Sequence, residues 1–283
     1  MKLIDFPGLN CYGNSLISIV HDFGVDYEIA FSNLWSETDF RYNPSTKAFV
    51  SKRLLASLHV LGARCTALPC ATPEETASSM ADLGTGACLV VGMDALHTPW
   101  NPNYGVFHGD HYFIAMTTGE RQVLFYDPTY HKRKEKMPYE LYLEHANELL
   151  LVEPCAKESL EIDHKSEIQN VLAQSSKTCL ELRTWLEGLL EDRRADWEVP
   201  AKYVECLMNN RYLYAHYLAH RAPELLSSAQ LFDESFFARW VAVKNGLIKA
   251  AIVRNNRSLI EDIVRHLSSL MELERGAAEK MQL

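Results

Sequence analysis

The amino-acid sequence predicts an α+β fold, in which helices pack on a curved antiparallel sheet and an all-α domain follows. Three observations carry this prediction. Helix and strand patterns are mixed up to about residue 155, two neighbouring strand patterns are joined by a short turn, and strand patterns stop near residue 163. We therefore predict a first domain over residues 1–155 and a helical domain over residues 163–283.

Three helices are expected in the first domain, each from a start signal. The turn-rich stretch 10–14 precedes an apolar run, Ser45 is a candidate N-cap, and acidic residues follow Pro73. The first predicted helix opens with the apolar run 15–20, with Cys11 in the turn that enters it; the others begin near Ser45 and at Pro73 and end near Leu61 and Leu83.

Five short segments rich in apolar residues predict strands. The turn signal Thr118-Gly119-Glu120 joins two of them into an antiparallel hairpin. The predicted strands span residues 63–68, 87–93, 110–117, 122–126 and 148–152.

Four long amphipathic stretches make up the second half. Their apolar residues recur at helical spacing, as Leu182, Leu186 and Leu189 do. Large apolar side chains gather in residues 231–240, where they either fill the bundle core or form a dimer face or the acceptor side of a cleft. The predicted helices span residues 166–191, 201–221, 233–253 and 256–281.

The composition excludes several kinds of protein. The net charge of -9 argues against nucleic acid as a partner, because phosphate binding needs clustered Lys and Arg. No apolar run approaches the roughly 20 residues that span a bilayer, and the N-terminus lacks the apolar core of a signal peptide, so a cytoplasmic protein is expected. The seven cysteines form no CxxC pair, so neither a disulfide framework nor a structural zinc site is expected.

Cys11, His111 and Asp127 are the candidate catalytic residues. A catalytic thiol needs a position that favours the thiolate, a base, and a group that orients the base. Cys11 opens the first predicted helix, where free N–H groups stabilise negative charge and the N–H of Cys11 itself can bind an oxyanion. His111 begins one strand of the hairpin and Asp127 ends the other, so Asp127 can orient the imidazole.

The hairpin register supports this pairing. A turn centred on residue 119 pairs residues whose numbers sum to 238, and 111 and 127 have this sum. The two side chains are therefore predicted to lie side by side. His108 is a second candidate base, but in this register it does not face Asp127.

The remaining histidines are not expected to hold a metal ion. Four histidines of the first domain lack a regular ligand spacing: His97, His108, His111 and His131. In the second half, His216 and His220 are expected in the core or at an interface.

Two further motifs each have two interpretations. The basic run 131–136 is either a solvated loop or a dock for an acidic partner such as a carrier protein. The aromatic loop 100–105 is either a packed connector or a cover over a substrate pocket.

The first 155 residues resemble the bacteriocin-processing cysteine peptidases. In that family a Cys opens the first helix, a His opens a strand, and Asp-Pro follows sixteen residues later, as it does from His111 to Asp127-Pro128. The stretches 136–142 and 149–154 also resemble the helix and closing strand of that fold. The resemblance implies a papain-like core and a Cys-His-Asp triad.

The layout of the whole chain is similar to the butirosin acyltransferase family. The thiol lies ten residues after Met1, and a helical half follows that contains the stretches 209–215 and 236–240. This resemblance implies transfer of an acyl group from a carrier-protein thioester to an amine in specialised-metabolite (antibiotic) biosynthesis. The implied partners are an acyl or peptidyl carrier protein and an amine-bearing small molecule, and the apolar cluster at residues 231–240 adds a homodimer as a further candidate. No cofactor is expected beyond the donor's phosphopantetheine arm.

One position departs from the papain-type pattern. Such peptidases place a Gln six residues before the Cys as an oxyanion donor, whereas this chain has Asp5 there. Asn10 and Asn14 are the candidate substitutes. A thioester is already activated and needs less oxyanion stabilisation than an amide does, so the departure favours acyl transfer over peptide hydrolysis. The alternatives are a cytosolic cysteine peptidase or amidase, and a catalytically inactive binding module.

Overall fold

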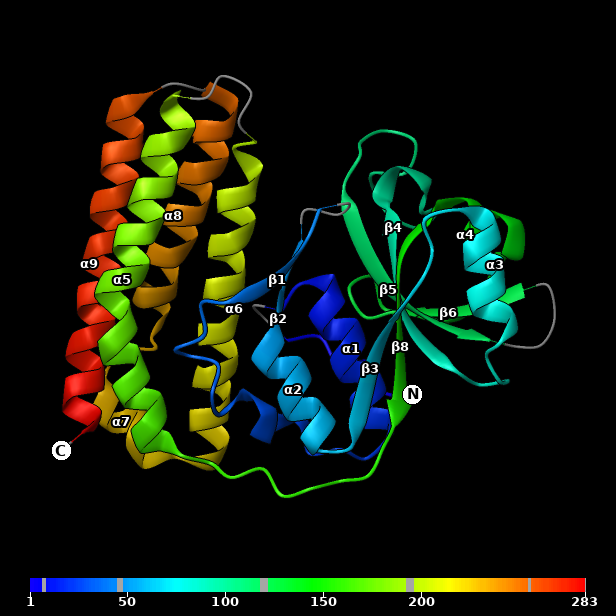
Figure 1. Ribbon diagram of the computed structural model, residues 1–283, viewed down its shortest axis with the longest axis horizontal. Helices are drawn as coiled ribbons and strands as arrows, with labels where there is room; N and C mark the ends of the chain where they lie inside the picture. The colour runs from blue at the N-terminus through cyan, green and yellow to red at the C-terminus, as the bar shows by residue number, and fades with distance from the viewer. Residues whose placement is uncertain (7–8, 45–47, 118–121, 192–195, 254–255, 283) are drawn as a thin grey trace. The chain divides into compact units, whose positions relative to one another are not determined.

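The computed structural model describes residues 1–6, 9–44, 48–117, 122–191, 196–253 and 256–282 (Figure 1). The chain forms two compact units. The sheet unit is built mainly from Met1–Tyr27 and Leu55–Leu160, and the helical unit from Glu28–Asn43, Lys47–Leu54 and Glu161–Leu283. The fold is thus α+β with an all-helical C-terminal region, and the segment 28–54 groups largely with those helices although it lies early in the sequence.

A six-stranded antiparallel sheet forms the centre of the sheet unit. The strands lie in the order β3-β8-β4-β5-β6-β7, and every neighbouring pair is antiparallel. Central strands read as apolar runs because both of their faces are covered, and in β4 every residue before Asp94 is buried. The strands are β3 (Ala63–Leu68), β4 (Cys88–Asp94), β5 (Asp110–Thr117), β6 (Gln122–Asp127), β7 (Lys132–Pro138) and β8 (Ala146–Pro154).

The hairpin of β5 and β6 has a different register from the predicted one. Ile114 pairs with Tyr126 and Thr117 with Val123, so paired numbers sum to 240 rather than 238. Continued by one step, this register sets Phe113 opposite Asp127. The shift moves each pair by two residues, and since side chains alternate with period two, His111 and Asp127 stay on one face of the sheet. The predicted turn at 118–120 lies outside the described residues.

Strand β7 replaces the loop in one of the two interpretations of the basic run 131–136, because residues from Lys132 onward form a strand. This segment pairs with β6 at the edge of the sheet, and its side chains are mostly exposed. The sequence pattern concealed a strand because β7 carries charges instead of apolar residues. Lysines on an edge strand discourage pairing with another chain, which gives these charges a structural role.

Helix α1 (Cys11–Asp22) packs against the central strands of the sheet. Every residue from Tyr12 to Val20 is buried, and α1 contacts β4, β5 and β8. Two of its buried polar residues have partners, since Ser18 Oγ donates to Asn14 O at 2.7 Å and the Asn14 amide donates to Asp5 Oδ1 at 2.9 Å. The sheet unit also holds α3 (Pro73–Ala81) and α4 (Tyr139–His145), and Thr72 caps α3 as its Oγ1 accepts from Glu75 N.

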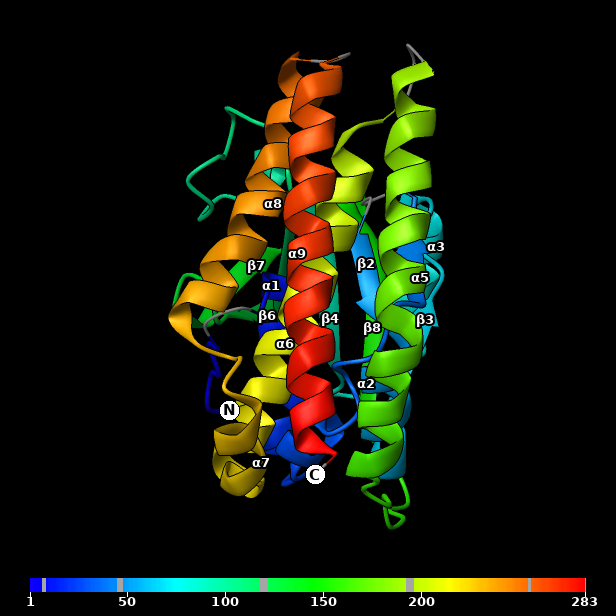
Figure 2. The same ribbon diagram turned by 90° about the vertical axis from the view of Figure 1, so that its left-hand side faces the viewer.

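Four long helices dominate the helical unit, as the sequence predicts. Figure 2 shows α9 between α5 and α8, and α9 contacts both. The large side chains of residues 231–240 fill the core, since Phe236 and Trp240 are buried. Within the described residues, no helix is long and apolar enough to cross a membrane. The helices are α5 (His164–Glu191), α6 (Glu198–Arg221), α7 (Pro223–Ala229), α8 (Glu234–Val253) and α9 (Arg257–Met281).

The early segment of the helical unit contains a short hairpin that the sequence analysis missed. Strands β1 (Phe40–Asn43) and β2 (Ala48–Ser51) pair antiparallel, so the predicted helix 45–61 is wrong over residues 48–51. The helix α2 (Lys52–Val60) begins only after Ser51, whose Oγ accepts from Leu54 N at 3.0 Å. The expected cap Ser45 lies outside the described residues. A short 3-10 helix, η1 (Tyr27–Phe31), precedes this hairpin.

Buried polar bonds attach this segment to the helices. Trp35 Nε1 donates to Glu274 of α9, and Glu37 accepts from Asn210 of α6 at 2.8 Å. Glu274 also forms a two-point ion pair with Arg211 of α6, through bonds of 2.7 and 2.9 Å. Because these groups lie almost fully out of solvent, the bonds satisfy charges that would otherwise be costly to bury.

Candidate active site

Cys11 is the first residue of α1, the position that the sequence predicts. Asn10 caps the helix with its Oδ1, which accepts from Gly13 N at 2.9 Å. Gly13 has no side chain to collide with Leu9, whose Cδ2 would lie 2.7 Å from an added Cβ. The thiol is partly exposed. It therefore lies at the positive end of a helix dipole, where a thiolate is stabilised and a substrate has access.

His111 lies between Cys11 and Asp127. Its Nε2 is 2.6 Å from Asp127 Oδ2, and both side chains are buried. The Cys11 thiol is the second hydrogen-bond partner of the ring, which leaves Nδ1 as the nitrogen that faces it. The structure thus brings the three residues together in the order thiol, imidazole, carboxylate.

Asp127 is held by two donors besides His111. Trp100 Nε1 donates to the same Oδ2 at 2.6 Å, and Tyr130 N donates to Oδ1 at 3.2 Å. The indole of Trp100 stacks on Phe125 with 3.7 Å between ring centroids. These donors fix the position of the carboxylate beside the imidazole. Loop 100–105 is therefore more than a connector, a role that its aromatic content alone did not reveal.

The surroundings of His111 favour its protonated form. Burial opposes the charge, but the hydrogen bonds and charges of Asp127 and Cys11 outweigh burial and raise the pKa of His111 to about 9. An imidazolium is then present at neutral pH beside the Cys11 sulfur. The stability that the folded protein gains from protonated His111 is complete below the ordinary histidine pKa of about 6.5. It is lost as the pH rises through the raised pKa of about 9.

We expect Cys11 to be alkylated by iodoacetamide at pH 6 at least about tenfold faster than Cys155. Cys155 is a matched control, because its sulfur lies 3.8 Å from His59 Nδ1 but it does not begin a helix. The His111→Ala variant should lose the low-pH reactivity and any inflection near pH 9. Peptide mass mapping after timed quenching measures both sites in one sample. Equal rates for Cys11 and Cys155 at pH 6 would remove the case for an activated thiol.

The other candidate histidines have different partners. His108 Nδ1 lies 2.6 Å from Asp94 Oδ2 and its ring is largely exposed, so Asp127 is paired with His111 and not with His108. His97 stacks on His145 with 3.9 Å between centroids. The contacts of His108 and His97 are therefore made with Asp94 and His145, and not with Asp127.

The structure distinguishes the two candidate oxyanion donors. Asn14 is buried, and its amide nitrogen already donates to Asp5 Oδ1 at 2.9 Å. Asn10 uses its oxygen for the helix cap, and its amide nitrogen has no partner among the described residues. Asn10 therefore joins the backbone N–H of Cys11 as the candidate donor.

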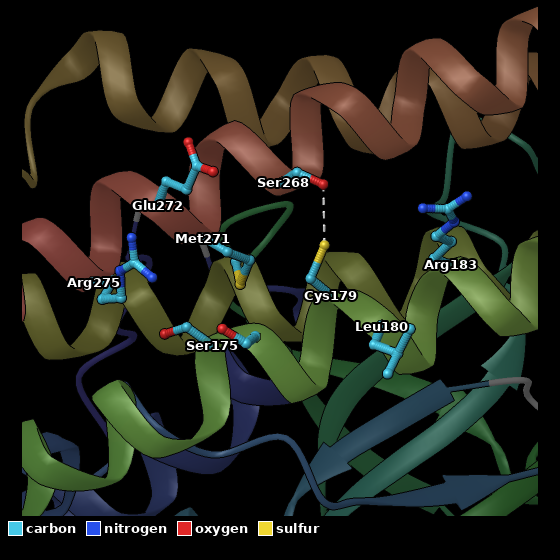
Figure 3. Close-up of a pocket in the computed structure, with 9 residues that line it drawn as sticks. Ser175, Cys179, Leu180, Arg183, Ser268, Met271, Glu272 and Arg275 are labelled. Carbon is cyan, nitrogen blue, oxygen red and sulfur yellow. Dashed lines mark hydrogen bonds between the residues drawn. The ribbon is translucent and has the colours of Figure 1, made fainter.

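A groove in the helical unit has a different chemical character. Its volume is about 280 Å³, and residues of α5 and α9 line it (Figure 3). Cys179 lies there beside Ser268 Oγ at 3.2 Å, without a histidine. The hydroxyls of Ser175 and Ser268 donate to carbonyls of their own helices. Elsewhere, burial raises the pKa of Cys88 to about 11. Neither cysteine has the surroundings of Cys11.

Comparison with protein-family models and with curated proteins gives no match for this chain. The chemistry of the site must therefore be argued from its geometry. A partly exposed thiol at a helix start, beside a buried imidazole that a carboxylate orients, is suited to covalent acyl chemistry.

Proposed function

We propose that this protein is a cysteine-dependent acyltransferase with a papain-like core. The observation that carries the proposal is the arrangement of Cys11, His111 and Asp127, with a 2.6 Å imidazole–carboxylate bond and the thiol at a helix start. The resemblance to the butirosin acyltransferase family supports transfer from a carrier-protein thioester to an amine. A carrier protein whose acyl group is attached to phosphopantetheine is the proposed donor.

In the first half-reaction, the Cys11 thiolate attacks the carbonyl carbon of the donor thioester. The oxyanion accepts hydrogen bonds from Cys11 N and the Asn10 amide. The tetrahedral intermediate then breaks its bond to the donor sulfur, which leaves as a thiol with the proton from the His111 imidazolium. The acyl group is now a thioester of Cys11, and His111 is neutral.

In the second half-reaction, an amine attacks the acyl-enzyme. Neutral His111 takes a proton from the attacking nitrogen, and the intermediate expels the Cys11 thiolate. The product is an amide, and the thiolate–imidazolium pair is restored. Asp127 holds the ring in place throughout, as an orienting carboxylate does in other triads.

A thioester is a better acyl donor for this site than an amide. Asp5 occupies the position of the usual Gln and accepts a hydrogen bond from Asn14, so it does not act as an oxyanion donor. A thioester has a good leaving group and needs less transition-state stabilisation. This favours transfer over peptide hydrolysis, the second candidate reaction.

The test is a covalent adduct on Cys11. The intact protein is incubated with a panel of S-acyl-pantetheine thioesters and analysed by mass spectrometry, with Cys11→Ser as the control. We expect one acyl group per chain, bound to the peptide that contains Cys11, and its faster release when amines are added. The absence of an adduct across the panel would refute the proposal. Release at the same rate with and without amines, together with peptide cleavage, would show a hydrolase.

Asn10→Ser should slow acylation by about 10²-fold, because serine preserves a helix cap but lacks the amide donor. Alkylation by iodoacetamide forms no oxyanion, so its rate should stay within about twofold of the wild-type rate. Stopped-flow acylation and timed alkylation measure the two rates. Equal losses in both reactions would show that Asn10 acts on the thiol and not on the oxyanion.

A further inference from the structure

Two histidines and a glutamate meet on the surface of the helical unit, and they belong to no part of the proposed active site. His216 and His220 are one turn apart on α6, and Glu28 comes from η1. His216 Nε2 lies 3.2 Å and His220 Nδ1 3.9 Å from Glu28 Oε1. The potential ligand atoms of all three residues lie within 4.8 Å of one another.

The two histidines are not in the core, which is one of the two environments that the sequence predicts for them. His216 is 25% exposed and His220 53% exposed, so water can reach the cluster and complete a coordination sphere. The Phe31 ring packs edge-on against the His216 ring, with 6.3 Å between the centroids. The arrangement is thus partly open on one side and packed on the other.

The chemical groups that meet here suit a cation. One carboxylate oxygen faces two imidazole nitrogens that come from neighbouring turns of one helix. Imidazole nitrogens and carboxylate oxygens are the usual protein ligands of Zn²⁺ and similar ions.

We propose that Glu28, His216 and His220 bind one divalent transition-metal ion such as Zn²⁺. Imidazole and carboxylate are suitable ligands for this ion, and with three protein ligands a fourth position remains for water. Arg221 Nε donates to Glu28 Oε2 at 3.0 Å, which leaves Oε1 for the metal and holds the ligating carboxylate. His220 Nδ1 must give up its 3.1 Å bond to His216 O, a partner that water can replace on this exposed side.

A bound ion would crosslink two distant parts of the helical unit. Glu28 and His216 are 188 residues apart in the chain, so the ion would close a long loop. It would tie the start of the early segment to α6. A stabilising site is therefore expected, and its effect does not depend on Cys11.

The experiment is a Zn²⁺ titration of the full chain after EDTA treatment, followed by calorimetry. The Cys11→Ser chain is used, so that a thiol beside His111 does not compete for the ion. We expect one site per chain, and at Zn²⁺ about 100-fold above Kd a rise in Tm of roughly 5–10 °C that EDTA reverses. Co²⁺ should give ligand-field bands without the near-ultraviolet charge-transfer band of a cobalt thiolate.

Three variants identify the ligands. His216→Ala and His220→Ala should each weaken Zn²⁺ binding at least about tenfold. His266→Ala is the matched control and should bind as the parent does, because this exposed ring also faces a carbonyl one turn back, at 2.8 Å from Asp262 O. Since His220 is exposed, its replacement tests the site even if His216→Ala unfolds. No heat of binding, a thiolate band, or unchanged affinity in His220→Ala would overturn the proposal.

Discussion

Replacing His111 with alanine is expected to slow acylation of Cys11 by about 10³-fold or more. The variant loses both the imidazolium that accompanies the thiolate and the acid that protonates the leaving thiol. In the proposed mechanism the three residues act as one unit, so adding Asp127→Ala to this variant should cause little further loss. The measurement is the single-turnover acylation rate with an S-acyl-pantetheine thioester at pH 7.

Two controls separate chemistry from folding in this series. At pH 10 an ordinary cysteine thiol is ionised without an imidazolium beside it, so iodoacetamide should modify the His111→Ala variant at close to the wild-type rate. Trp100→Phe retains the ring that stacks on Phe125 but removes the 2.6 Å bond to Asp127. This variant should lose only about tenfold in acylation rate, since Tyr130 still donates to the carboxylate. Acylation within about threefold of wild type in His111→Ala would show that another base serves the thiol.

The second large effect concerns the buried ion pair of the helical unit. Glu274→Gln should lower the free energy of unfolding of this unit by about 3–5 kcal/mol, or its Tm by roughly 10 °C. The change leaves the Arg211 guanidinium buried over Trp240, at 4.9 Å, with its charge no longer matched. Urea unfolding followed by circular dichroism at 222 nm measures the loss.

An exposed pair and a double variant complete this test. Glu187→Gln removes the surface partner of Arg183 on α5 and should change stability by less than about 0.5 kcal/mol. Replacing both buried partners, with Arg211→Met and Glu274→Leu, should recover most of the loss, because no unmatched charge then remains. A loss below about 1 kcal/mol in Glu274→Gln would mean that water reaches the pair.

The sequence predicted those parts of the fold whose residues repeat with a clear period. The four long helices were found because apolar residues recur along one face, and α9 begins after Asn256, which caps it. The grouping of Cys11, His111 and Asp127 was also expected. The register behind that expectation was wrong by two residues per pair, but the two-residue period of a strand kept both side chains on one face.

The missed features depend on partners that are distant in the sequence. Strands β1 and β2 have four residues each, too few for alternation to show a period. The role of Trp100 depends on a carboxylate 27 residues away, and the cluster at Glu28 on histidines of α6. Such contacts follow from tertiary structure, and spacing along the chain does not contain them.

The early segment of the helical unit also has a consequence for the order of folding during synthesis. Trp35 leaves the ribosome 239 residues before its partner Glu274. At about 5–20 residues per second, its ring waits roughly 10–50 s for α9 to be made. Until then the nascent chain exposes apolar side chains that a chaperone can bind. They include Phe31, Leu34 and Trp35, which are fully buried in the folded unit. Emergence of α9 is therefore the step that lets this unit close.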